Sequence, residues 1–181
     1  MIGLAAALYV TEGCGAKPGD LKPFVRGDMA KLVVEPTGPP PPAGAFLDAQ
    51  GQPTDLSRLK APVVVVNLWA TWCGPCVTEM PTLARLQAEF PGQVLVVPIS
   101  MDGPKDREKA RAFIAQYPGL SFYQDPKAAL VWTFTPPVEG LPTTLLYDPS
   151  GHERARLTGG ADWSGPDARA VIKALLQAKS G

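Results

Sequence analysis

Histidine and cysteine are scarce in this sequence. The 181 residues contain one histidine, His152, and three cysteines. A zinc site needs about four nitrogen or sulfur ligands, which this chain does not supply, so we expect neither a bound metal nor another cofactor. If two of the three cysteines form one functional pair, the remaining thiol cannot build a framework of structural disulfides.

An excess of charge of either sign is also absent. Lys and Arg together number 17, and Asp and Glu together number 17, so the net charge is zero. A strongly basic balance is the usual mark of binding to nucleic acid or to an anionic membrane surface, and nothing here favours either partner. The chain length fits one domain with extensions.

No apolar run is long enough to cross a bilayer. Residues 1–10 are almost entirely apolar, but a spanning helix needs about 20 such residues. No basic segment precedes them, so they are not a complete signal peptide. Three interpretations stay open: the second half of an anchor whose start is missing, an uncleaved signal core, or a short buried helix. We favour the truncated anchor, and we expect Cys14 to be a linker thiol without a role.

Proline, by contrast, is abundant, and four prolines follow one another at 39–42. A run of this kind adopts extended polyproline II and acts as a semi-rigid spacer. Before it, residues 20–33 predict a short helix with Asp20 as its cap. We therefore divide the chain into a lead-in over 1–44, with the apolar remnant and the Pro-rich segment, and a domain over 45–181.

The domain is organised around two cysteines, Cys73 and Cys76, with two residues between them. Four successive valines predict a buried strand over 63–68, and residues 77–90 predict a helix. The pair therefore lies where a strand ends and a helix begins. Unpaired backbone N–H groups and the helix dipole favour a thiolate there, and the thiolate is the nucleophile of disulfide exchange. A C-x-x-C in this setting indicates a thioredoxin-like redox site.

The longer motif carries a more specific resemblance. The string Val-Asn-Leu-Trp-Ala-Thr-Trp-Cys at 66–73, with Glu-Met-Pro at 79–81, resembles the TlpA branch of thioredoxin-fold proteins, which includes ResA and CcmG types. The similarity covers residues 45–179. It implies an α/β thioredoxin fold: a central mixed sheet flanked by helices, with an N-terminal hairpin and a helix-strand insertion.

The same resemblance implies a place and a task. Members of this branch are thiol reductases anchored by their N-termini on the periplasmic side of the bacterial inner membrane. The implied targets are disulfide-containing periplasmic proteins, among them factors for cytochrome oxidase or cytochrome c maturation. The implied electron donor is a membrane thiol protein, and the expected form is a monomer.

The segments around the motif predict elements that agree with this fold. Residues 45–54 predict a small edge hairpin, and residues 93–101 predict the strand that follows the motif helix. A helix over 105–117, a short strand over 120–123 and a second helix over 125–134 form an insertion that minimal thioredoxins lack.

The C-terminal part predicts a hairpin and a last helix. Residues 143–148 and 153–157 predict two antiparallel strands, so the sheet is mixed, and His152 is expected to be a solvated residue of their turn. The last helix covers 164–178, with Ser164 as its cap.

A proline stands just before this hairpin, at position 142. The matching proline of the thioredoxin fold is cis and lies against the cysteine pair, so the resemblance predicts a cis bond here; an ordinary trans proline is the alternative. A cis bond would turn neighbouring backbone groups outward to pair with an extended target peptide. The predicted substrate-binding residues are Trp72, Gly74, Pro75, Leu141, Pro142 and Thr143.

One position departs from plain thioredoxins. They carry a buried aspartate six residues before the first cysteine, and here that place is Asn67, which cannot accept a proton from the second cysteine. The nearest ionisable candidate is Glu79, three residues after Cys76 and on the same helix face. ResA-type proteins use a glutamate at this position, so the resemblance makes Glu79 a catalytic residue beside the cysteines. An exposed helix residue without a role is the alternative.

Three activities compete for this site. In a thiol-disulfide oxidoreductase, Cys73 attacks a target disulfide and Cys76 resolves the mixed disulfide; the resemblance to TlpA-type reductases implies that reduction is the direction. A thiol peroxidase would need its cysteine three residues after Thr or Ser, but Thr71 is two residues before Cys73. A copper-handling assembly factor would add a distant histidine, and His152 lies in the wrong place. We therefore expect a protein-disulfide reductase.

Overall fold

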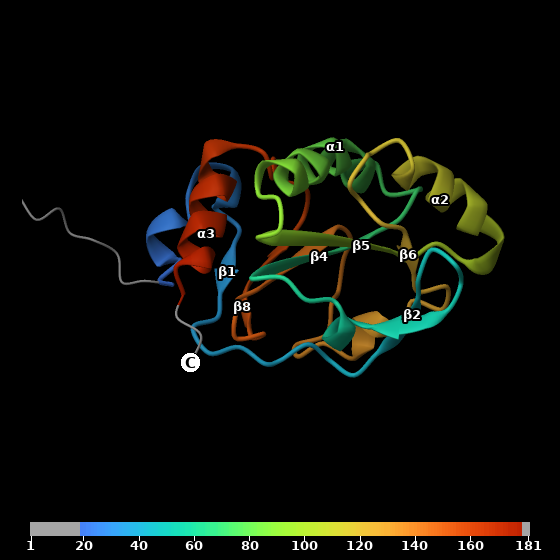
Figure 1. Ribbon diagram of the computed structural model, residues 1–181, viewed down its shortest axis with the longest axis horizontal. Helices are drawn as coiled ribbons and strands as arrows, with labels where there is room; N and C mark the ends of the chain where they lie inside the picture. The colour runs from blue at the N-terminus through green and yellow to red at the C-terminus, as the bar shows by residue number, and fades with distance from the viewer. Residues whose placement is uncertain (1–18, 179–181) are drawn as a thin grey trace, which may run out of the picture.

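A computed structural model describes residues 19–178 of the chain (Figure 1). One mixed sheet has the strand order β1-β8-β7-β4-β5-β6-β2-β3. The strands are β1 (Val33–Val34), β2 (Ala45–Leu47), β3 (Pro53–Asp55), β4 (Val63–Trp69), β5 (Val94–Ser100), β6 (Tyr123–Gln124), β7 (Thr143–Tyr147) and β8 (Glu153–Thr158). The α-helices are α1 (Gly74–Glu89), α2 (Arg107–Ile114) and α3 (Pro166–Leu176). The 3₁₀ helices are η1 (Lys22–Phe24), η2 (Gly27–Met29), η3 (Leu56–Arg58), η4 (Pro104–Asp106) and η5 (Leu130–Trp132).

The centre of the sheet confirms the predicted mixed arrangement. β4 pairs in parallel with β5 and antiparallel with β7, and β7 pairs antiparallel with β8. The β-branched run that begins β4 suits a strand with neighbours on both sides and helices or loops over both faces. The motif strand therefore ends at the middle of the sheet, so the segment that follows it is supported from both sides.

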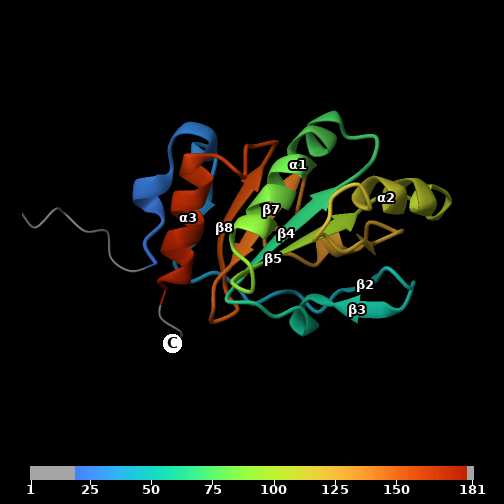
Figure 2. The ribbon, with the colours of Figure 1, turned by 45° about the horizontal axis from the view of Figure 1, so that its top comes forward.

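Two apolar layers cover the two faces of the sheet. Val63, Val65 and Trp69 pack with residues of α1, α2 and α3. Val66 and Leu68 face the other way and pack with residues of β2 and η5. Figures 1 and 2 show α1 and α2 on one side of the central strands β4 and β5, and the β2–β3 hairpin, at the end of the strand order, on the other side. This hairpin was predicted, and β3 lies at the sheet edge as expected.

The predicted helix over 20–33 is wrong. Its place is taken by η1, η2 and the strand β1, and the positive φ of Gly27 interrupts the helical backbone between them. The apolar spacing was nevertheless meaningful, since Leu21 and Met29 are fully buried. β1 then pairs with β8, and the carbonyl of Pro39 accepts from the backbone N–H of Glu153. The described part of the lead-in is thus packed against the domain.

The insertion after β5 is less helical than the sequence predicts. The first helix is present, as η4 followed by α2, and the short strand is β6, slightly later than expected. The second predicted helix, over 125–134, is wrong except for η5. The helical path is interrupted at Ala128, whose φ is +48°, and the Asp125 carboxylate accepts from the backbone N–H groups of Lys127 and Leu130 and so stabilises the turn.

The C-terminal hairpin of β7 and β8 confirms the prediction, and His152 is exposed in its turn. The cap of the last helix was predicted wrongly. Helix α3 begins at Pro166 with Gly165 as its N-cap, and the hydroxyl of Ser164 instead donates to Asp162. Within residues 19–178, no helix is both long and apolar enough to cross a membrane. Residues 1–10 and Cys14 lie outside the described part of the chain.

Candidate active site

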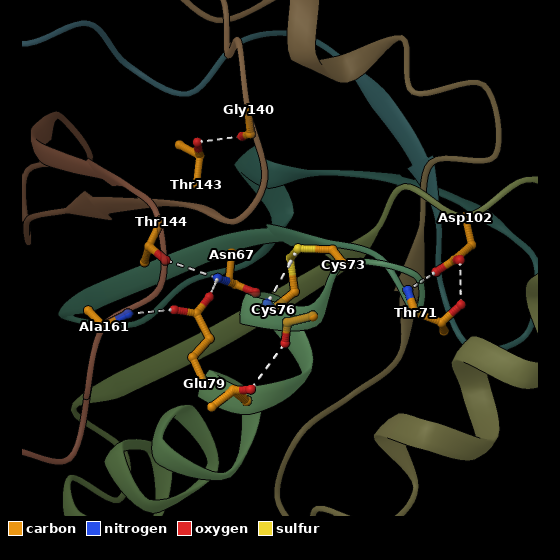
Figure 3. The surroundings of a disulfide bond; sticks show 12 residues. Asn67, Thr71, Cys73, Cys76, Glu79, Asp102, Gly140, Thr143, Thr144 and Ala161 are labelled. Carbon is orange, nitrogen blue, oxygen red and sulfur yellow. Dashed lines mark hydrogen bonds between the residues drawn. A yellow bond between two sulfur atoms is a disulfide. The ribbon is translucent and has the colours of Figure 1, made fainter.

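A disulfide joins Cys73 and Cys76 at the start of α1 (Figure 3). Cys73 is the N-cap residue, and α1 begins at Gly74, earlier than the predicted residue 77. Pro75 belongs to the first turn, where its missing N–H costs nothing. The backbone N–H of Cys76 donates to Cys73 Sγ at 3.3 Å. The sulfur of Cys73 therefore lies at the end of the helix that carries unpaired N–H groups and the positive end of the dipole.

The two cysteines differ in their exposure to solvent. Cys73 is 7% exposed, whereas Cys76 is completely buried. The first cysteine is thus the more accessible one, as its position at the N-terminal end of the helix implies, although it is less open than a free surface thiol. Around it lie exposed residues: Trp72 is 69% exposed, and a Cβ added to Gly74 would meet no atom within 4 Å. A target that approaches this surface reaches Cys73 first.

The loop between β4 and Cys73 is fixed by Asp102, a residue that the sequence did not single out. Its fully buried carboxylate accepts from the backbone N–H of Thr71 at 2.9 Å, from the Thr71 hydroxyl at 2.7 Å and from the Ser100 hydroxyl at 2.8 Å. Figure 3 shows Thr71 turned toward Asp102. The one signal in the sequence for this role is that Asp102 follows β5 closely. Neighbouring parallel strands end at the same edge of the sheet, so a residue just after β5 lies near the loop that follows β4.

The bond between Leu141 and Pro142 is cis, as the resemblance predicted. Thr143, the next residue, pairs with Leu68 in the sheet register, so Pro142 lies opposite the end of β4 and beside the cysteine loop. The Pro142 carbonyl accepts from the backbone N–H of Gly159, and the Thr143 hydroxyl donates to the carbonyl of Gly140 at 2.8 Å. These two groups are therefore occupied within the chain, whereas Leu141 is half-buried at the surface.

Glu79 is buried, and the alternative of an exposed helix residue is wrong. It is 3% exposed and lies one helical turn beyond Cys76 in α1. Its Oε1 accepts from the side-chain amide of Asn67 at 2.8 Å. Its Oε2 accepts from the backbone N–H of Ala161 at 3.2 Å and from the indole N–H of Trp163 at 3.3 Å. The carboxyl group is thus held between β4 and the segment that follows β8.

The surroundings of Glu79 change its acidity. Burial raises the pKa of Glu79 from 4.5 to about 7, although the hydrogen bonds from Asn67, Ala161 and Trp163 act in the opposite direction. A group with this pKa can both accept and release a proton near neutral pH. Cys76 and Glu79 are three residues apart on one helix, a spacing that places side chains on the same face.

The sequence did not indicate the partners of Glu79. Asn67 stands at the place of the missing aspartate, but nothing in the sequence connects Thr144, Ala161 or Trp163 with the site. Asn67 donates to the Thr144 hydroxyl at 2.9 Å as well as to Glu79. These partners come from β7 and from the segment before α3, and their positions depend on strand register, for which the local sequence gives no signal.

His152 lies at the opposite end of the sheet from the disulfide. The register pairs Leu68 with Thr143 at the cysteine end and Val64 with Tyr147 at the other end, and the turn with His152 follows Tyr147. A shared metal site with the cysteines is therefore not possible for this histidine. Among residues 19–178, no group of three or more His, Cys, Asp or Glu side chains is arranged to hold a metal ion.

Comparisons with known proteins agree with this geometry. The family model described as "AhpC/TSA family" matches residues 37–159. The thiol-disulfide oxidoreductase ResA of Bacillus anthracis is 30% identical over 134 residues, which cover 73% of each chain. ResA of Bacillus cereus is 28% identical over 148 residues, covering 81% of this chain and 82% of that one.

Solved structures show the same relationship. One is the crystal structure of a Chlorobium tepidum protein that is provisionally described as a thiol:disulfide interchange protein DsbE. It superposes with a TM-score of 0.66 and is 28% identical, and the match covers 80% of this chain and 99% of that one. A thio-disulfide isomerase from Thermus thermophilus has a TM-score of 0.63 at 29% identity, with 81% and 99% covered. The chain is thus a thioredoxin-fold thiol-disulfide oxidoreductase, and it belongs to the AhpC/TSA family in the branch of TlpA, ResA and CcmG types.

Proposed function

We propose that this oxidoreductase reduces disulfide bonds of proteins outside the cytoplasm, with Cys73 as the attacking sulfur. The observation that carries the proposal is the unequal access to the pair: Cys73 is 7% exposed and Cys76 is completely buried. A target can bond to the first sulfur while the second waits behind it, as a two-step exchange requires. Exchange in the direction of reduction starts from the dithiol form of the pair.

The proposed reaction begins with the thiolate of Cys73, which the helix end and the Cys76 N–H stabilise. It attacks one target sulfur, an S–S bond forms to Cys73, and the other target sulfur leaves as a thiolate. The Cys76 thiol then releases its proton to the Glu79 carboxylate and attacks Cys73 Sγ. The disulfide of the pair forms, and the second target sulfur leaves. Two electrons have moved to the target, and a donor must return them.

The proposed binding surface surrounds Cys73. Trp72, Gly74 and Pro75 are exposed and offer apolar contact with a target. An extended target segment would pair with the backbone at Leu141, since the Pro142 carbonyl is already bonded to Gly159. In this arrangement Pro142 and Thr143 contribute by holding the backbone of Leu141 in place.

The proposed setting follows from membership of the family. The targets would be disulfide-bonded periplasmic proteins, among them factors for cytochrome oxidase or cytochrome c maturation, and a membrane thiol protein would return the electrons. We propose a monomer attached through its N-terminal segment to the periplasmic side of the bacterial inner membrane. The apolar residues 1–10 support this attachment, and the division into a lead-in over 1–44 and a domain over 45–181 remains part of the proposal.

A turnover assay tests the function directly. We expect the protein to accelerate the reduction of insulin disulfides by dithiothreitol and to leave hydrogen peroxide consumption at the uncatalysed rate. The peroxidase alternative is not favoured, because the Thr71 hydroxyl is bonded to Asp102 and so is not free to assist peroxide at Cys73. Peroxide consumption faster than insulin reduction would contradict the proposal.

The insertion between β5 and β7 provides a second prediction, on target choice. Trp132 in η5 is 74% exposed, a large apolar surface that the packing of the domain does not explain. We expect Trp132→Ser to keep full activity on a small disulfide such as oxidised glutathione and to lose at least half of its rate on the natural protein target. The exposed Lys105→Ser in η4 is the matched control. Parallel loss on both substrates would argue against a role in recognition.

A further inference from the structure

The side chain of Asn67 carries a polar atom that the disulfide form leaves without a partner. Asn67 is fully buried in β4. Its amide nitrogen donates to Glu79 and Thr144, but its carbonyl oxygen, Oδ1, has no hydrogen-bond partner within residues 19–178. Buried acceptors in native proteins normally accept a hydrogen bond. A buried acceptor without a donor, beside a redox centre, therefore indicates that the other redox state of the protein provides the donor.

The orientation of this amide is determined by its neighbours. The Glu79 carboxylate offers acceptor atoms, and its Oε2 is already occupied by two donors, Ala161 N–H and Trp163 Nε1–H. When Glu79 is ionised its oxygens can only accept, so the end of Asn67 that lies 2.8 Å from Oε1 is the NH₂ end. Because the amide is planar, its oxygen is directed away from Glu79.

Cys76 lies on the same stretch of α1 as Glu79, the helix that Asn67 faces. Val65, Asn67 and Trp69 alternate with residues of the other face, so their side chains point to α1. Cys76 and Glu79 are one turn apart on the facing side of α1, with Cβ atoms about 5–6 Å apart at this spacing. The amide that contacts Glu79 therefore faces the turn of α1 that also carries Cys76, and Figure 3 draws Asn67 next to both residues.

We propose that the Cys76 thiol of the reduced protein donates a hydrogen bond to Asn67 Oδ1. In the disulfide, the Cys76 sulfur is bonded to Cys73 and carries no proton. Reduction adds two electrons and two protons, breaks the S–S bond, and leaves one S–H on Cys76. That S–H satisfies the free acceptor. The inference deepens the proposed function, because it takes Cys76 as the thiol that waits in the reduced pair.

Two effects follow from this hydrogen bond. A hydrogen bond made by the neutral thiol disfavours the thiolate, so Asn67 keeps Cys76 protonated while Cys73 ionises. The bond also exists in the reduced state alone, so it stabilises the dithiol relative to the disulfide and makes the pair a milder reductant. Asn67 is thus a positioning residue for the buried sulfur, and it separates the acidities of the two cysteines.

Infrared spectroscopy of the S–H stretch tests the contact itself. The double variant Cys14→Ser, Cys73→Ser leaves Cys76 as the one cysteine of the chain. We expect its S–H band at lower frequency in the folded protein than in urea, and we expect Asn67→Leu to return it to the unbonded position. Thr144→Val is the control: it removes another partner of the Asn67 amide but keeps Oδ1, so the shifted band should remain.

An unshifted S–H band in the folded protein whose one cysteine is Cys76 overturns the proposal. This measurement leaves Asn67 unchanged, so it does not depend on whether Asn67→Leu folds. A band that stays shifted in Asn67→Leu overturns it as well, since another acceptor would then hold the thiol.

Equilibration with glutathione gives the second measurement, with the cysteine pair intact. We expect Asn67→Leu to move the equilibrium toward the disulfide by roughly twofold to tenfold, the range for loss of one hydrogen bond. No movement contradicts the proposal. Insulin reduction separates this result from the function: a protein that reduces insulin without a shifted S–H band refutes the hydrogen bond alone, and one that shows the band but leaves insulin intact refutes the reductase.

Discussion

In the variant Cys76→Ser, disulfide exchange should stop at the mixed disulfide, with the target covalently attached to Cys73. Without the second thiol, the mixed disulfide has no intramolecular exit. Serine is close in size to cysteine, and position 76 is completely buried, so the surface that a target meets is unchanged. We expect insulin turnover at the uncatalysed rate. We also expect covalent adducts on non-reducing gels, and dithiothreitol should cleave these adducts.

The origin of the adducts is established by two further changes. Cys14→Ser removes the third thiol of the chain, and Cys73→Ser in that background should abolish every adduct. Adducts isolated from bacterial membranes should contain a cytochrome or oxidase maturation protein. Recovery of unrelated abundant proteins alone would contradict the proposed pathway, while adducts that survive Cys73→Ser would contradict the assignment of the attacking sulfur.

The second large effect concerns the stability of the folded protein and Glu79. The pKa of Glu79 rises from 4.5 to about 7 on folding, mainly because the carboxyl group is buried. The folded state therefore binds this proton more tightly than the unfolded chain does. The resulting stabilisation is complete below pH 4.5 and is lost as the pH rises through 7. Its size, from the difference between the two pKa values, is about 3 kcal/mol.

Replacing Glu79 with Gln removes this titration and changes the shape little. We expect the unfolding free energy of the parent, minus that of Glu79→Gln, to fall by about 3 kcal/mol between pH 4.5 and pH 8.5. Urea unfolding of the disulfide form across this range measures it. Glu89→Gln is the control in the same helix, where the carboxylate is exposed and paired with Arg169. A constant difference for Glu79→Gln would mean that this carboxyl group titrates alike in both states.

The same variant tests the role of Glu79 in exchange. With no carboxylate one turn from Cys76, the second thiol has lost its base, so resolution of a preformed mixed disulfide should slow. Loss of the negative charge should at the same time lower the pKa of Cys76. Stopped-flow release of a bound target measures the first effect, and thiolate absorbance measures the second. A rate and a pKa equal to the parent values would leave Glu79 with a structural role.

The sequence predicted those parts of the site whose residues are neighbours in the chain. Four valines, a cysteine pair and Pro75 lie within one stretch of chain, so a strand, an exposed turn and a helix start could be placed from that stretch. The buried surroundings of Glu79 could not be placed in this way. Trp163 and Ala161 come from the segment between β8 and α3, more than 80 residues along the chain from Glu79, and their approach depends on the packing of the whole domain.

The errors in the fold have a common physical origin. Apolar spacing marked the buried residues Leu21 and Met29 correctly, but it could not show that Gly27 has a positive φ. In the insertion, the side chain of Asp125 accepts hydrogen bonds from backbone N–H groups of a turn. The same side chain could accept such bonds as a helix cap, so its presence in the sequence fits either structure. Such competition is settled by tertiary contacts, which spacing alone does not describe.

The position of Gly19 determines how the molecule can be held. Its carbonyl accepts from Arg154 near the start of β8, and a Cβ on it would lie 3.0 Å from Ala178 Cβ. Both ends of the described chain therefore leave from one corner, at the end of the sheet away from the disulfide, which is roughly 15–20 Å distant along the strands. A linker to a bead, an electrode or a bilayer at either end would present Cys73 outward, free to meet large targets.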